Sequence, residues 1–205
     1  MPSPFAHAAV GYTLYRLTRS DTDKKITLSL PVFRSMDLPS SLLVSLGLSL
    51  APDLDAIAGL AFHDMANFHN NGTHSLLVGA AVSLLVAFLA SRKARLQGAA
   101  WRASFWRWFA IAFSSYGVHI FMDFLTRGGR GVRLLWPLVG ARFIPVVEVF
   151  YGVDWGAGWF SVHHLVTFGT ELIFIALLFG GLWLFEHLQK VGRGVEPGPV
   201  GGAQD

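Results

Sequence analysis

Long apolar stretches with few charged residues are the feature that most limits what this chain can fold into. They cover Pro4–Leu17, Leu38–Ala51, His74–Ser91, Phe105–Leu125 and Leu165–Phe185. The last two have about 20 residues each, enough for a helix rising ~1.5 Å per residue to cross a ~30 Å hydrocarbon core. The third is near the lower limit, and the first two are short enough to be tilted, buried in a bundle or re-entrant. The lengths predict an all-α, multi-pass transmembrane bundle of about 4–5 helices.

The composition agrees with a chain that lies in lipid. Charged residues make up 14% of it, against about 25% in an average soluble domain, and the mean hydropathy is +0.48. There is no cysteine, which excludes disulfides and thiolate metal sites. Lys and Arg occur in short runs between apolar stretches and not in a stripe among aromatic residues, so we expect a lipid bilayer and no nucleic acid as partner.

The positions of the basic residues predict an orientation. If the apolar stretches alternate in direction, most Lys and Arg residues fall on one face, which the positive-inside rule makes cytoplasmic. Four arginines fall on the opposite face: Arg127, Arg130, Arg133 and Arg142.

The same reading divides the chain into a membrane domain and a tail. Residues 1–190 form the membrane-embedded domain, and within it the long connection 127–164, rich in Gly and aromatics, is predicted to be an irregular extramembrane lid. Residues 191–205 are Gly- and Pro-rich and are predicted to be disordered.

Ligand-type side chains stand at the ends of the apolar stretches. With alternating directions, all of these ends fall at one side of the membrane, and the side chains predicted to converge there are His7, Asp53, Asp55, His69, His74, His119 and Asp123. His119 and Asp123 are four residues apart and share a helix face. Imidazole and carboxylate ligands without thiolate suit one or more divalent ions, with Zn²⁺ first and Mn²⁺ or Fe²⁺ as alternatives.

Simpler interpretations exist for each pair taken alone. An isolated His119/Asp123 pair would usually be a surface ion pair, the two aspartates of 53–55 could form a helix-ending turn, and His69 and His74 could cap a helix at the interface. Taken together, and inside apolar stretches where ionisable groups are costly, they favour a metal site.

The motifs resemble a known family, the YdjM-like membrane-bound metal-dependent hydrolases of the bacterial inner membrane. The resemblance covers most of residues 1–175, and the motifs that carry it are His7, Pro52-Asp53-Leu54-Asp55, His69-x-x-x-Thr73-His74-Ser75, His119-x-x-x-Asp123, Leu125-Thr126 and Leu134-Leu135-Trp136-Pro137. A more distant similarity to zinc-dependent phospholipase C and P1-type nucleases implies phosphoester chemistry. Asn70 departs from the pattern, because the family often has Arg directly after the first His of that motif.

Residues and resemblance together predict a metal-dependent hydrolase that uses a metal-activated water. Asp55 or Glu171 would be the general base; Glu171 falls where the family tends to carry a late Glu. Arg127, Arg130 and Arg133 would hold an anionic small-molecule, phosphoester or lipid substrate. The alternative is a divalent-metal transporter or regulatory membrane protein without hydrolytic activity, and a third possibility is a structural membrane protein without metal.

Overall fold

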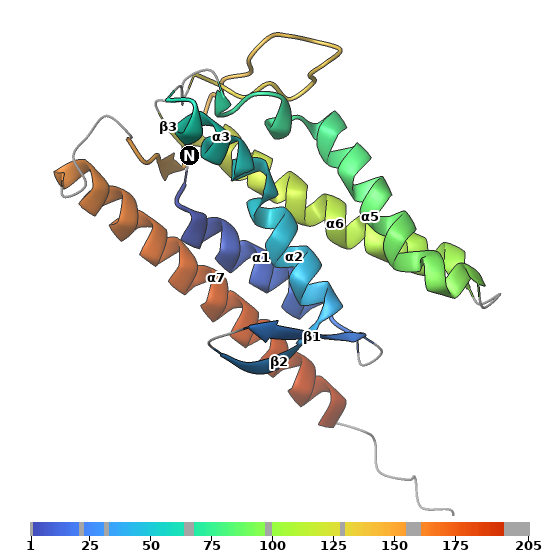
Figure 1. The fold of residues 1–205 in the computed structure, drawn as a ribbon. Helices are drawn as coiled ribbons and strands as arrows, with labels where there is room; N and C mark the ends of the chain where they lie inside the picture. The colour runs from blue at the N-terminus through green and yellow to red at the C-terminus, as the bar shows by residue number, and fades with distance from the viewer. Residues whose placement is uncertain are drawn as a thin grey trace, which may run out of the picture.

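Helices make up most of the chain, which confirms the all-α class (Figure 1). The computed structural model describes residues 2–20, 23–30, 33–63, 68–96, 100–127, 130–154 and 161–194. The elements in chain order are α1 (Pro4–Thr18), β1 (Lys25–Leu30), β2 (Phe33–Pro39), α2 (Ser40–Leu50), η1 (Ala51–Asp53), α3 (Leu54–Ala61), η2 (Gly72–His74), α5 (Leu76–Leu96), α6 (Trp101–Phe124), β3 (Thr126–Arg127), β4 (Phe150–Tyr151) and α7 (Val162–Gly194).

The second apolar stretch is longer than predicted. We expected it to end at Pro52, but the chain continues through the 3₁₀ turn η1 into α3. Pro52 lies in the first turn of η1, where its missing N–H costs no hydrogen bond, so it changes the helix type without ending the helix. Ser40–Ala61 is therefore long and apolar enough to cross a membrane.

α7 is the second helix with the length and composition of a membrane span. In a soluble protein a helix this apolar would be mostly buried, yet only 17% of its most apolar window is buried. Leu172, Ile173 and Leu177 are among its exposed side chains, as expected for a surface that contacts lipid. α7 runs to Gly194, so the first residues of the predicted tail are helical, and residues 195–205 lie outside the described part.

Two small β elements were not predicted. β1 and β2 form an antiparallel hairpin between α1 and α2, in which the Thr27 hydroxyl donates to Asp37 at 2.7 Å. β3 and β4 are short parallel strands that pair the start of the lid region with Phe150 and Tyr151 further along it. β3 and β4 have only two residues each, too few for a sequence pattern to predict a strand.

Small residues allow the helices of the bundle to approach closely. Ser41, Ser45 and Ser49 form a fully buried stripe on α2, and a Cβ at Gly11 of α1 would lie 2.9 Å from the Ser45 backbone oxygen. Such small-residue interfaces are typical of helices packed in membranes. α5 and α6 pack in the same way, since a Cβ at Gly79 would meet the Tyr116 ring at 2.7 Å.

Candidate metal centre

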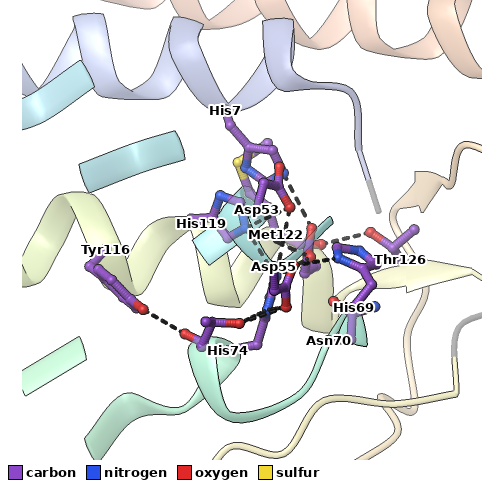
Figure 2. Close-up of polar contacts among 12 residues, drawn as sticks. His7, Asp53, Asp55, His69, Asn70, His74, Tyr116, His119, Met122 and Thr126 are labelled. Atoms are coloured by element: carbon purple, nitrogen blue, oxygen red, sulfur yellow. Dashed lines mark hydrogen bonds and ion pairs between the residues drawn. The ribbon is translucent and has the colours of Figure 1, made fainter. Parts of the chain in front are cut away.

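Four ligand-type side chains meet at the end of the bundle where η1, η2 and α6 come together, and Figure 2 labels three of them, Asp53, His74 and His119. Asp53, His74, His119 and Asp123 each offer one ligand atom, and these atoms all lie within 4.8 Å of one another. His74 Nε2 is 3.0 Å from Asp123 Oδ2 and 3.3 Å from His119 Nε2. His119 Nε2 is 3.5 Å from Asp53 Oδ1. We call these four residues the central group.

Local structure explains how each member reaches this point. His119 and Asp123 are one turn apart on the buried face of α6. Asp53 ends the 3₁₀ turn that Pro52 favours between α2 and α3. His74 ends η2, just before α5 begins. Three separate segments, η1, η2 and α6, therefore bring the four ligand atoms to one end of the bundle.

The carboxylates of the central group are buried and make no well-formed hydrogen bond with the residues that the structure describes. All four oxygens of Asp53 and Asp123 are shielded from solvent, and none accepts a hydrogen bond within the described part of the chain. His74 Nε2 and His7 Nε2 lie 3.0 Å and 3.2 Å from the two Asp123 oxygens. Burying carboxylates is costly, so positive charge on these rings or on a bound cation has to offset that cost. Two imidazole nitrogens and two carboxylates are a donor set that zinc and other divalent first-row metals accept, so the residues fit a divalent cation.

The imidazole rings are oriented by groups behind them. His119 Nδ1 donates a hydrogen bond to the Ser49 carbonyl oxygen at 2.7 Å, which leaves Nε2 as the atom facing the central group. His74 Nδ1 is 3.2 Å from Asp55 Oδ2, and this contact orients the His74 ring in the same way. Both rings thus turn Nε2 toward the central group, and Nε2 is the atom through which each could bind a metal.

Asp55 also belongs to a second group, with His69 and His74, whose ligand atoms likewise lie within 4.8 Å of one another. Asp55 Oδ1 is 2.9 Å from His69 Nδ1, and Thr73 donates its hydroxyl to Asp55 Oδ2 at 2.6 Å. Unlike Asp53 and Asp123, Asp55 has its oxygens satisfied by protein groups. His69 Nε2, by contrast, is buried and has no hydrogen-bond partner in the described chain.

His7 comes from α1 and lies against the central group. Its ring stacks on His119 with 3.8 Å between ring centroids, and its Nε2 is 3.2 Å from Asp123 Oδ1. The structure thus brings together all seven side chains predicted to converge, with His7 beside the central group and Asp55 and His69 in the second group.

Tyr116 supports the site and was missed in the sequence. Its hydroxyl donates to the Thr73 carbonyl at 2.6 Å and so anchors η2, which carries His74. Tyr116 lies one turn before His119 on α6, so its position on the ligand face of a helix was a usable signal.

Glu171, predicted as a possible base, is buried on α7 and contacts the segment before α1. Its Oε1 accepts from the Ser3 backbone N–H at 2.6 Å, and Oε2 accepts from the Ser3 hydroxyl. It is in neither ligand group. Its role as a base stays a prediction, while its contacts fasten the start of α1, and hence His7, to α7.

The lid arginines differ in their partners. Arg127, largely exposed, donates to the Tyr151 hydroxyl at 2.9 Å and lies 3.7 Å from Glu148. Burial, together with the positive charges of Arg133 and Arg130, lowers the pKa of Arg142, so these three arginines share one region of positive potential.

Arg142 was not predicted as a site residue, yet it joins the lid to Asn70 and Asn71, which lie between His69 and His74. Its guanidinium donates to the carbonyl oxygens of Asn70 at 3.1 Å and Gly131 at 2.9 Å, and to Asn71 Oδ1 at 2.9 Å. The sequence showed it only as one of the four arginines on this face.

The lid covers the ligand groups. Ser75 donates its hydroxyl to the Trp136 carbonyl at 2.5 Å, and the Trp136 ring packs on Gly72. A small cavity of about 20 Å³ remains beside Asp123, and lid residues including Ile144 and Pro145 line it. The site is therefore shielded from bulk solvent in this conformation.

Comparisons with known proteins agree with the membrane assignment. A family model described as YdjM inner membrane protein matches residues 1–191. The inner membrane protein YbcI of Escherichia coli (strain K12) is 28% identical over 155 residues, which cover 71% of this chain and 84% of that protein. No solved structure matches this chain.

Proposed function

This chain belongs to the YdjM family of inner membrane proteins, and from that premise we propose that it is a membrane-bound metal-dependent hydrolase. The observation that carries the proposal is the pair of carboxylates of Asp53 and Asp123, whose four oxygens are shielded from solvent and make no hydrogen bond in the described chain, beside His74 and His119. These four residues would hold one divalent cation, with Zn²⁺ as the first choice and Mn²⁺ or Fe²⁺ as alternatives. When bound, such a cation lowers the pKa of water from 15.7 to about 7 and polarises a phosphoryl or carbonyl oxygen.

The second group would accept the proton. Asp55 takes a hydrogen bond from His69 Nδ1, which leaves the lone pair of the unpartnered His69 Nε2 available as a base. A carboxylate behind an imidazole is the arrangement that orients a general base in many hydrolases. Asp55 would therefore act through His69, and also through His74, whose ring it orients.

The arginines support an anionic substrate. Arg130 and Arg133 lie close enough to Arg142 to lower its pKa, and a phosphate would relieve that repulsion. Arg127 lies at the start of the same lid. A phosphoester or lipid-derived substrate at the membrane interface agrees with this charge and with the exposed apolar helices.

The orientation belongs to the same proposal. The basic connections would lie in the cytoplasm, and the metal centre would face the opposite side of the inner membrane. That side gives a lipid head group direct access to the lid.

A transporter or regulatory protein could hold the same ion, but transport requires polar groups that continue through the membrane. The hydroxyls of Thr13, Ser83 and Ser115 instead donate to carbonyls of their own helices. The residues deeper in the bundle thus give less support to this alternative than to a one-sided hydrolytic site.

Metal analysis and an activity screen on the same samples test the proposal. We expect one divalent ion per chain in detergent-purified protein, and hydrolysis of at least one member of a panel of phosphodiesters, phospholipids and carboxylic esters. His119→Ala and Asp123→Ala should lose both the metal and the activity. His69→Gln should keep the metal and lose activity by about 10²–10⁴-fold.

Gly180→Ala on α7 serves as the control, since a Cβ there meets nothing within 4 Å. Activity that survives His119→Ala would refute the catalytic site. Loss of metal in His69→Gln would make His69 a ligand instead of a base. Stoichiometric metal with no hydrolysis across the panel would favour the transporter or regulator.

A further inference from the structure

A groove lies between α2, α5 and α6 near the hairpin, toward the end of the bundle away from α3 (Figure 1). Its volume is about 690 Å³, within the ~300–1,000 Å³ typical of small-molecule sites. None of the residues that line it belongs to the metal centre, so the groove is a separate candidate binding site.

The walls of the groove are apolar and leave open space. α2 contributes Leu43 and Val44, and α5 contributes Val86 and Leu89. Gly47 lies in the middle of the α2 wall, and a Cβ built on it would meet no atom within 4 Å. The groove therefore has room for a hydrocarbon chain alongside Gly47.

The mouth of the groove is polar and carries a net positive charge. Lys24 and Arg107 line it together with Asp23, and Arg107 Nη2 holds the Asp23 carboxylate at 2.6 Å. Lys24 is exposed and forms no ion pair with the residues that the structure describes. The Ser40 hydroxyl, also at the mouth, is shielded from solvent and has no hydrogen-bond partner there.

We propose that this groove binds one anionic phospholipid, with an acyl chain along Gly47 and the phosphate at Lys24 and Ser40. The position supports a lipid over a soluble ligand, because Ser40 begins the stretch Ser40–Ala61 that can cross a membrane. Basic residues next to such a helix end attract anionic head groups. The Ser40 hydroxyl gains the acceptor that it lacks, and the free charge of Lys24 gains a counter-ion.

Native mass spectrometry of the full chain tests this proposal. The protein would be released from nanodiscs that contain phosphatidylglycerol and phosphatidylcholine in equal amounts. We expect one retained phosphatidylglycerol per chain. Gly47→Phe should abolish its retention by filling the groove, and Lys24→Gln should lower the preference for it about fivefold.

Gly180→Phe is the matched control, because Gly180 is an exposed glycine of α7 whose Cβ also meets no atom within 4 Å. It should leave lipid retention unchanged. Metal content and melting temperature of each variant confirm folding independently of the lipid result, and neither depends on hydrolytic activity.

Three outcomes would overturn the proposal. Equal retention of the two lipids would mean that the groove takes lipid without regard to charge. Unchanged retention in Gly47→Phe would place the lipid elsewhere. A dimer that Gly47→Phe abolishes, with no difference in lipid, would assign the groove to a second copy of the chain.

Discussion

The buried carboxylates of the central group make the folded protein less stable when no cation is bound, because burying an uncompensated charge costs free energy. Asp123 has no exposed side-chain surface, and neither of its oxygens accepts a well-formed hydrogen bond in the described chain. The side chain of Asp53 is 12% exposed, but its two oxygens are likewise shielded and make no hydrogen bond there. A ligand that binds only the folded state stabilises it, by about 4 kcal/mol when it is present at 1,000 times its Kd. The residues that hold the metal should therefore also make stability depend on it.

Removing the metal should lower the melting temperature of the wild-type protein. Asp123→Asn keeps the size of the side chain but removes its charge, so the variant should bind no metal. A chelator should then leave its melting temperature unchanged. Thermal unfolding in detergent with and without EDTA measures both effects, and equal sensitivity of the two proteins to EDTA would contradict the assignment of Asp123.

Asp55→Asn tests whether Asp55 orients the metal ligand His74 or binds the metal itself. Because Asp55 contacts His74 Nδ1 and is already satisfied by Thr73 and His69, the variant should still bind one ion but about 10–100-fold more weakly. Competition with a chelating dye gives the affinity. Thr73→Val removes one hydrogen bond to the same carboxylate and should have a smaller effect. Complete loss of metal in Asp55→Asn would make Asp55 a direct ligand.

At the scale of the elements, the close contact between α1 and α2 positions His7. Gly11 of α1 faces the Ser45 backbone and the Ser49 side chain of α2, and the Ser49 carbonyl in turn holds His119. Backbone atoms cannot move aside as a side chain can. The small residues at this contact therefore set the distance between two helices that serve the site.

Gly11→Ala should force α1 and α2 apart and destabilise the protein by about 1–3 kcal/mol, with weaker metal binding as His7 moves. Gly169→Ala is the control, since it is also a glycine in a helix and its Cβ meets nothing within 4 Å. Melting temperature and metal affinity of the two variants check the expectation. Equal stability of the two would show that the helices adjust without cost.

The lid is held by side chain–backbone contacts more than by its own secondary structure. Arg142→Lys should lose most of the bonds to Asn70, Asn71 and Gly131, because an ammonium cannot reproduce the planar fork of a guanidinium. Hydrogen exchange of the lid amides should become faster. Arg127→Lys, at a largely exposed arginine of the same lid, should change exchange little. Equal effects of the two substitutions would show that Arg142 does not clamp the lid.

At the scale of the whole molecule, the orientation in the membrane decides what reaches the metal centre. The chain has no cysteine, so single cysteines report sidedness without a background. Ala100→Cys lies before α6 and Gly140→Cys lies in the lid, and both positions are exposed. An impermeant thiol reagent added outside spheroplasts should label Gly140→Cys and not Ala100→Cys. Labelling of both from one side would overturn the proposed topology.

The sequence by itself determined the class of the fold and the convergence of the ligands. Length and hydropathy act locally, and a bilayer that excludes unpaired backbone groups turns apolar stretches into helices. The ligands lie at the ends of successive apolar stretches. Because such stretches alternate in direction across the membrane, these ends were expected on the same side of the bundle. The structure accordingly gathers His7, Asp53, His74, His119 and Asp123 at one end.

Only the tertiary structure decided what each polar group contacts. The contact of Glu171 with Ser3 and the clamp formed by Arg142 both depend on partners distant in the chain. Hydrogen bonds are short-ranged and directional, so a shift of about 1 Å between helices changes which donor reaches which acceptor. Sequence patterns fix the side of a helix on which a residue lies, whereas packing fixes the partner that it meets.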